Sequence, residues 1–237
     1  MTTPLLLLLG GSFNPPHAGH LRIAIETAEA LRPALTLFIP CAHPPHKSGN
    51  NLLPFALRTR MLTAAIEEDM FPTGTEQGKP AFAVSEVENE RQGPSFTVDT
   101  LGVLRERYPG MRPAFVMGSE DFAQLSSWRR WREIPELADL VVLPRSAGAA
   151  DSFRNSTFAF WPEARLLAPP AAAVRSAFVL PGGGRLLYLP QPLLDISSSL
   201  VRERVLDGRS LDFLVPPSII RLLKEHEALV ADLWRGD

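Results

Sequence analysis

The chain has 237 residues, a formal net charge of −2 and one cysteine, Cys41. A nearly balanced charge gives no reason to expect a nucleic-acid-binding or membrane-binding surface, so neither partner is predicted. One cysteine excludes an internal disulfide and a cysteine-based zinc site, and Cys41 is predicted to be a small apolar filler at a strand end. The apolar run from Leu5 to Leu9 is too short for a membrane span and follows no basic residue. We therefore expect a cytoplasmic protein.

Short apolar runs alternate along the chain with segments of helical period. This alternation is typical of a parallel sheet with crossover helices. The fold predicted is α/β: a Rossmann-like, doubly wound parallel sheet over residues 1–195, and a small helical subdomain over residues 196–237. Strands are expected at 4–9, 34–39, 81–86, 113–117, 139–143 and 185–189, and helices at 19–31, 54–69, 95–108, 128–137, 197–206 and 216–233.

Residues 144–184 interrupt this alternation. They are rich in Ala, Pro, Gly and Ser, with scattered aromatic residues such as Phe153 and Trp161. A connection of this length is uncommon in a compact domain, so we expect a long surface excursion that its aromatic residues pack in part onto the domain.

The run from Gly10 to His20, GGSFNPPHAGH, follows the first predicted strand and opens a helix. Glycines let the backbone approach an anion, and the first turn of the new helix offers unpaired N–H groups. His17 and His20 lie about one helical turn apart, so both can donate to one polyphosphate. An ordinary strand-to-helix turn with packed histidines is the simpler alternative.

A second candidate phosphate site lies in the C-terminal subdomain, at Ile196 to Arg202, ISSSLVR. Serine hydroxyls and helix N–H groups bind phosphate, and an arginine can contact the same oxygens through two donors. Taken alone, this run also fits a plain serine N-cap followed by a solvated arginine.

The first run resembles the GxFxPxHxGH signature of the nucleotidyltransferase superfamily of α/β phosphodiesterases, and the second is similar to its ISSTxxR motif. The resemblance implies chemistry at the α-phosphate of a nucleoside triphosphate. It implies that His17, His20 and Arg202 are catalytic. The ATP and phosphate contacts it implies within the two motifs are Gly10, Gly11, Ser12, Phe13, Ile196, Ser197, Ser198 and Ser199.

Three internal segments are similar to one family of this superfamily, the bacterial-type nicotinate-nucleotide adenylyltransferases. In Pro40 to Lys47, PCAHPPHK, the resemblance places Lys47 at the phosphates. In Gly93 to Leu101, it implies that Ser95, Phe96 and Thr97 bind nicotinate mononucleotide, and we expect Ser95 or Thr97 to cap the helix. In Val116 to Asp121, VMGSED, the resemblance assigns Gly118 and Glu120 to ATP binding. It assigns a ring-stacking role to Trp128, which follows this segment.

Several residues depart from the family pattern. Asn14 stands where Asp is frequent, Phe96 where Tyr is usual and Ser199 where Thr is usual. Asn14 and Ser199 keep the capacity to form hydrogen bonds. Asp121 directly follows Glu120, so the sequence leaves open which carboxylate fills the family's ribose-binding position. A metal site at His43 and His46 is a further alternative, although no acidic or cysteine cluster lies near them.

The resemblance implies transfer of the adenylyl group of ATP to nicotinate mononucleotide, with Mg²⁺ accompanying the ATP and no metal ligand from the protein. A homo-oligomer is possible on this basis. Two alternatives stay open: a related adenylyl or cytidylyl transferase with another acceptor, such as nicotinamide mononucleotide or phosphopantetheine, and a non-catalytic nucleotide sensor. A dinucleotide-dependent reductase is disfavoured because no GxGxxG follows the first strand.

Overall fold

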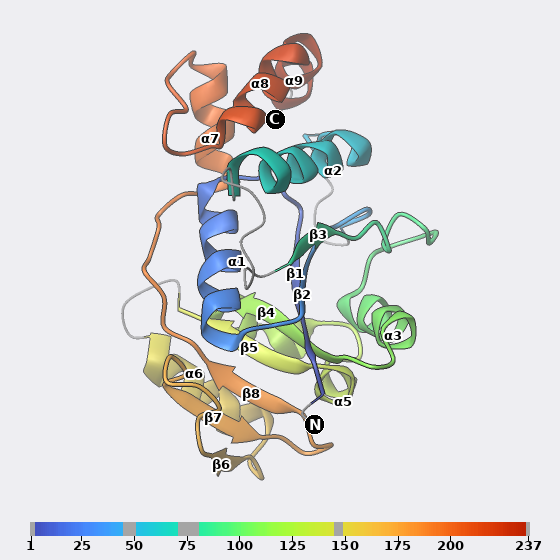
Figure 1. Cartoon of the computed structure of the whole chain (residues 1–237), viewed down its shortest axis with the longest axis vertical. Helices are drawn as coiled ribbons and strands as arrows, with labels where there is room; N and C mark the ends of the chain where they lie inside the picture. The colour runs from blue at the N-terminus through green and yellow to red at the C-terminus, as the bar shows by residue number, and fades with distance from the viewer. Residues whose placement is uncertain (1–2, 45–50, 71–80, 145–148, 236–237) are drawn as a thin grey trace.

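The computed structural model describes residues 3–44, 51–70, 81–144 and 149–235. Within these ranges eight strands form one sheet in the order β3-β2-β1-β4-β5-β8-β7-β6 (Figure 1). The first six strands in this order run parallel, and β7 and β6 are each antiparallel to their neighbour. The strands are β1 Leu5–Gly11, β2 Leu35–Pro40, β3 Phe82–Val84, β4 Arg112–Gly118, β5 Asp139–Leu143, β6 Arg165–Leu167, β7 Ser176–Val179 and β8 Arg185–Tyr188.

Helices connect most of the strands. The α-helices are α1 Ala18–Leu31, α2 Phe55–Ala64, α3 Thr97–Arg107, α4 Ser119–Ala123, α5 Ile134–Leu137, α6 Ala149–Phe160, α7 Ser198–Leu206, α8 Pro217–Glu225 and α9 Glu227–Arg235. A π-helical turn, η1 Ala65–Met70, continues α2, and 3₁₀ turns cover Leu125–Ser127 (η2) and Trp131–Glu133 (η3). None of the helices in the described ranges has the length and apolarity that a membrane span requires.

The sheet is buried on both faces, which explains the uninterrupted leucine run of β1. Because side chains alternate along a strand, Leu7 packs into one buried cluster and Leu8 into the other. The first cluster includes residues of α1, α2, α8 and α9, and the second includes residues of α3, α4 and α6. Figure 1 shows α1 and α3 on opposite sides of β1. The predicted α/β, doubly wound architecture is confirmed.

The prediction of a surface excursion at 144–184 is wrong. The described part of this segment forms α6 and the antiparallel strands β6 and β7, which extend the sheet beyond β8 (Figure 1). Phe153 and Trp161 are buried in the second cluster. The glycine-rich turn between β7 and β8 allows this hairpin: Gly182 and Gly183 have φ of 91° and 90°, and a Cβ on Gly184 would lie 2.1 Å from the Pro135 carbonyl oxygen.

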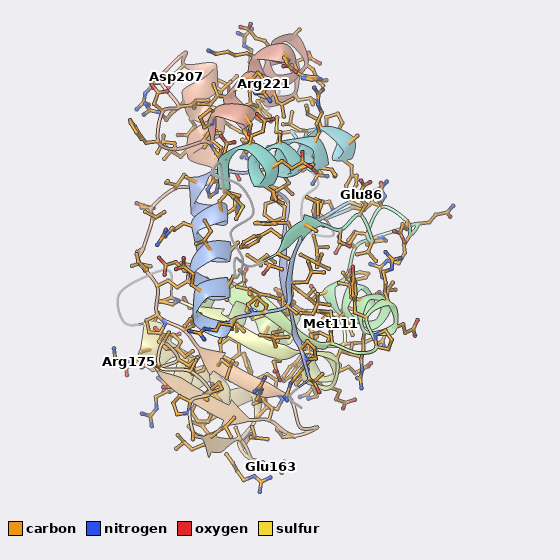
Figure 2. The ribbon with its side chains drawn as sticks, viewed as in Figure 1. Glu86, Met111, Glu163, Arg175, Asp207 and Arg221 are labelled. Carbon is orange, nitrogen blue, oxygen red and sulfur yellow. The ribbon has the colours of Figure 1, made fainter. Side chains whose placement is uncertain are left out.

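Two of the predicted helices are divided. The segment 216–233 forms α8 and α9, which meet at His226, and the segment 128–137 forms η3 and α5 after Arg130, whose φ is 50°. α8 packs against α2 and η1, and α9 packs against α7 and α8. Val201, Ile219 and Trp234 belong to the first buried cluster. Arg221 of α8 pairs with Glu68 of η1 at 2.8 Å, on the upper surface in Figure 2.

Candidate active site

One cleft of about 1220 Å³ opens at the carboxyl ends of β1 and β4. In parallel sheets, the crevice beyond the carboxyl ends of the strands is where ligands bind. Every predicted site residue that the structure describes lines this cleft. They are Gly10, Gly11, Ser12, Phe13, His17, His20, Ser95, Phe96, Thr97, Gly118, Glu120, Trp128, Ile196, Ser197, Ser198, Ser199 and Arg202. Lys47 and His46 lie outside the described residues.

The two histidines of the first motif stack on one another at the start of α1. Their ring centroids are 3.7 Å apart, and the backbone N–H of His17 donates to Nδ1 of His20 at 3.2 Å. The ring of Phe13 packs edge-on against His20 with the centroids 4.9 Å apart, and Phe13 is itself buried. The two imidazoles are therefore oriented before any substrate enters.

Two glycines of this motif allow close approach of a ring. A Cβ on Gly19 would lie 3.0 Å from Nδ1 of His17, so a side chain there would press on the imidazole. A Cβ on Gly10 would lie 3.3 Å from the ring of Phe115, which packs across the end of β1. The glycines thus allow the close approach of rings as well as of backbone.

The second motif packs directly against the first, although the sequence separates them by more than 170 residues. Arg202 donates to the Asn14 carbonyl oxygen at 3.0 Å and to Oγ of Ser199 at 3.0 Å. The hydroxyl of Ser198 donates to the Pro15 carbonyl oxygen at 3.0 Å. The two predicted phosphate motifs therefore form one wall of the cleft.

Serine capping occurs at one of the two predicted helix starts. Ser197 is the N-cap of α7, and its Oγ accepts from the Leu200 N–H at 3.1 Å. At α3 the N-cap is Phe96 and no side chain caps it. Ser95 instead accepts from the His43 N–H at 3.2 Å. The prediction that Ser95 or Thr97 caps α3 is wrong, because Ser95 fastens the segment after β2.

The side chain of Asn14 bridges the first motif to the segment before α2. Its amide nitrogen donates to the Asn51 carbonyl oxygen at 2.8 Å, and its oxygen accepts from the Leu53 N–H at 2.9 Å. Arg58 of α2 strengthens this link: it donates to the Leu53 carbonyl at 2.9 Å and to the Ser12 carbonyl at 2.7 Å. Burial lowers the pKa of Arg58 to about 10, so it stays cationic at neutral pH. No local sequence signal indicated this anchoring.

A polar network links the segment after β2 to α3. Glu88 accepts from the Ala42 N–H at 3.3 Å and from the Thr100 hydroxyl at 2.9 Å. Cys41 lies partly exposed beside it, and burial together with the Glu88 carboxylate raises the pKa of its thiol to about 12. Cys41 is therefore an uncharged thiol that follows β2 and adjoins this polar network. Among the described residues, no three His, Cys, Asp or Glu side chains converge as metal ligands.

Residues that follow β4 also line the cleft. Glu120 and Asp121, in the first turn of α4, are both exposed and both line the cleft, so either carboxylate is placed to meet a ligand. The Trp128 ring packs edge-on against Phe115 with centroids 6.2 Å apart. Trp131 is partly buried against Trp161 and does not line the cleft.

Comparison with known proteins connects this cleft to a family. A model of the Cytidylyltransferase-like family matches residues 8–204. A protein of Pelobacter propionicus named "Probable nicotinate-nucleotide adenylyltransferase" is 37% identical over 222 residues, which cover 92% of this chain and 95% of that protein. The chain belongs to the nicotinate-nucleotide adenylyltransferase family. A member from Trichlorobacter lovleyi, with the same printed name, is 39% identical over 90% of this chain and 92% of its own length.

Solved structures agree with the family at the level of the fold. The Plasmodium falciparum nicotinic acid mononucleotide adenylyltransferase complexed with NaAD superimposes with a TM-score of 0.70 at 17% identity, covering 97% of this chain and 98% of the other. The same protein complexed with APC gives a TM-score of 0.68. The nicotinate-nucleotide adenylyltransferase fold predicted from the motifs is thus confirmed.

Proposed function

We propose that the chain transfers the adenylyl group of ATP to nicotinate mononucleotide, giving nicotinate adenine dinucleotide and pyrophosphate. One observation carries this proposal: a single cleft is lined both by the two phosphate motifs and by the aromatic residues Phe96 and Trp128. The family relatives of similar length carry the name of this reaction. The arrangement suits one substrate with a polyphosphate and another with an aromatic ring.

The proposed reaction is a direct in-line displacement. An oxygen of the mononucleotide 5′-phosphate attacks the α-phosphorus of ATP, a new phosphoanhydride bond forms, and the bond to the β-phosphate oxygen breaks to release pyrophosphate. The attacking phosphate is already ionised at neutral pH, so no general base is required. The protein's work is to hold two anions in line and to offset their charge.

His17, His20, Lys47 and Arg202 are the proposed donors to the polyphosphate. Stacked imidazoles held by the His17 N–H and by Phe13 need little reorganisation to donate. Arg202 already contacts the phosphate loop through the Asn14 carbonyl, so its guanidinium is positioned at the same place. These contacts support the proposed catalytic roles of the three described residues.

We propose that the pyridine ring of the mononucleotide stacks on Trp128. The indole packs against Phe115 in a T-shaped arrangement and lines the cleft. Phe96 supplies the ring platform that the family usually draws from Tyr. Ser95 and Thr97 complete this proposed subsite at the start of α3, with Gly118 and a carboxylate of α4 toward the ATP ribose.

Mg²⁺ is proposed to enter with the ATP triphosphate as part of the substrate. The imidazole and guanidinium groups of the described cleft suit phosphate oxygens. When bound, the ion would neutralise part of the triphosphate charge. The cytoplasmic location and the homo-oligomer stay predictions from the sequence.

Pyrophosphate release tests the proposal. The protein is incubated with ATP and Mg²⁺ and one of nicotinate mononucleotide, nicotinamide mononucleotide or no acceptor. We expect rapid release with the nicotinate form and little in the other two reactions. Release with neither acceptor would contradict the proposal and favour another acceptor or a nucleotide sensor.

A further inference from the structure

Arg129 lies in the cleft at a position that no motif predicted. It directly follows Trp128 and lines the same cleft. Its guanidinium carbon is 4.8 Å from the centroid of the Phe96 ring, which comes from a distant part of the sequence. A guanidinium at this distance over an aromatic face is attracted by the ring's quadrupole. Arg129 therefore brings a positive charge to the part of the cleft that Phe96 and Trp128 line.

The other arginines of the cleft are engaged elsewhere. Arg22 pairs with Glu26 on the same helix, and Arg202 is bonded at the phosphate loop. Arg129, by contrast, forms no ion pair with any residue that the structure describes. Its guanidinium keeps its hydrogen-bond donors for a ligand.

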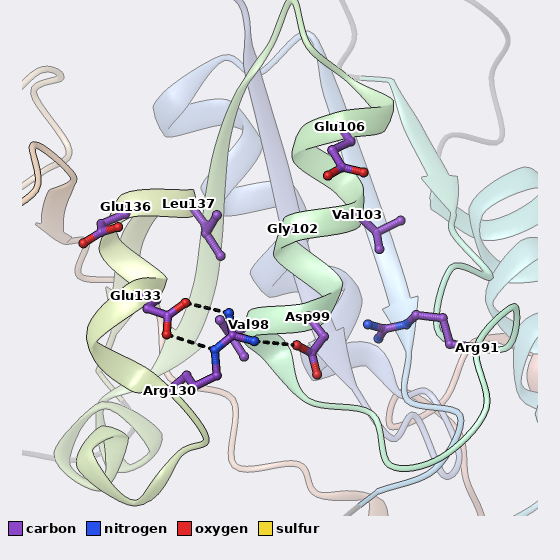
Figure 3. A pocket seen from close by; sticks show the side chains of 10 residues that line it. All are labelled: Arg91, Val98, Asp99, Gly102, Val103, Glu106, Arg130, Glu133, Glu136 and Leu137. Atoms are coloured by element: carbon purple, nitrogen blue, oxygen red, sulfur yellow. Dashed lines mark hydrogen bonds and ion pairs between the residues drawn. The ribbon is translucent and has the colours of Figure 1, made fainter.

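The next residue, Arg130, illustrates the difference. It pairs with Glu133 at 2.6 Å and with Asp99 at 3.2 Å. Figure 3 shows it held between these two carboxylates. It lines a separate pocket of about 380 Å³ between α3 and α5. Of the two adjacent arginines, only Arg129 lines the large cleft.

A cation in the part of the cleft lined by Phe96 and Trp128 favours an acidic ligand over a neutral one. Glu88, whose carboxylate is held by Ala42 and Thr100, lines the cleft together with Ser95. Its negative charge opposes an incoming carboxylate. The nicotinate and nicotinamide rings have nearly the same shape. They differ in a carboxylate against a neutral carboxamide, so a site can separate them by charge and by hydrogen-bond pattern.

We propose that Arg129 is a specificity-determining residue that donates to the pyridine carboxylate of the acceptor and so selects the acid over the amide. This inference rests on the proposed function. The stacking on Phe96 limits the motion of the guanidinium, which reduces the entropy lost when it binds the carboxylate. A hydrogen bond between charged groups changes affinity by about 10- to 100-fold, and a neutral amide gains little of it.

The test compares Arg129→Gln with the matched control Arg132→Gln. Arg132 also stacks on an aromatic ring, with its guanidinium carbon 4.4 Å from the Trp131 ring centroid, but it does not line the cleft. For each protein, kcat and KM are measured with nicotinate and with nicotinamide mononucleotide, and thermal unfolding checks the fold. Arg129→Lys tests whether the charge alone restores the preference.

We expect Arg129→Gln to lower kcat/KM for the nicotinate form by about 10- to 100-fold, mainly through KM, with a change of less than about threefold for the nicotinamide form. Arg132→Gln should match the wild type, and Arg129→Lys should recover much of the preference. An unchanged ratio of the two kcat/KM values in Arg129→Gln would overturn the inference while leaving the proposed function standing. A wild-type protein inactive with nicotinate mononucleotide would instead overturn the proposed function.

Discussion

Substitution of Asn14 tests how the loop of the first phosphate motif is held in place. Asn14 is only 2% exposed, and its amide acts as donor to the Asn51 carbonyl and as acceptor from the Leu53 N–H. The same Asn51 carbonyl accepts from Nε1 of Trp234 at 3.0 Å. Asn14→Asp keeps the shape and the acceptor but replaces the donor with an oxygen. The substitution places Asp, the residue frequently found at this position in the family, in the surroundings that this chain provides for Asn14.

The expected cost follows from the two contacts. Loss of the donor removes a hydrogen bond worth about 1 kcal/mol and brings two acceptor oxygens together, at the place where Nδ2 now lies 2.8 Å from the carbonyl. Burial of an ionised carboxylate with one remaining donor adds a desolvation cost, part of which the stronger Leu53 contact offsets. We estimate a net loss of about 2–4 kcal/mol in the free energy of unfolding at pH 8.

Urea unfolding of the wild type and Asn14→Asp, at pH 8 and at pH 5, measures this cost. We expect burial to raise the folded-state pKa of the new carboxyl above its unfolded value of about 3.9, against the opposing effect of the Arg202 guanidinium at the Asn14 carbonyl. The deficit is therefore complete well above the folded pKa and shrinks as the pH falls, because the neutral acid can donate to Asn51 again. Asn155→Asp, at an exposed position of α6, controls for the added charge. An Asn14→Asp protein as stable as the wild type at pH 8 would refute the reasoning.

Three further predictions concern single side chains of the cleft. His20→Ala should lower kcat at least about 100-fold while KM for nicotinate mononucleotide changes less than about threefold; comparable losses in both would mean that His20 mainly supports the fold. Trp128→Ala should raise KM for nicotinate mononucleotide about tenfold and leave KM for ATP nearly unchanged, and an effect confined to ATP would exclude the stacking role. Because its thiol pKa is raised to about 12, Cys41 should react with iodoacetamide at pH 8 at least about 100-fold more slowly in the folded protein than in urea. Equal rates in the two states would contradict the thiol environment described here.

The parts of the site that the sequence predicted are those held by local geometry. The run from Gly10 to His20 contains the end of a strand, two close contacts between a glycine and a ring, and the start of a helix. Each of these features favours particular residue types, which can be recognised in the sequence. The serine cap of α7 is equally local. The leucine run predicted a strand at 4–9, and β1 is buried on both faces, as expected of a strand without a polar side.

The features that the sequence did not predict depend on contacts between distant segments. Arg58 anchors Ser12, and Arg129 stacks on Phe96, only because the fold brings their elements together. The hairpin of β7 and β8 did leave a signal, since the run from Pro181 to Gly184 between two apolar stretches is typical of a tight turn. The composition of residues 144–184 outweighed that signal and gave the wrong prediction of a surface excursion.

The most direct test of the account is a competition among acceptors in one reaction. The protein is mixed with ATP, Mg²⁺ and equal amounts of nicotinate mononucleotide, nicotinamide mononucleotide and phosphopantetheine, and the adenylylated products are identified by mass. The account predicts that nicotinate adenine dinucleotide is the dominant product and that it disappears with His20→Ala. A dominant product from either of the other acceptors, or none from the wild-type protein, would contradict it.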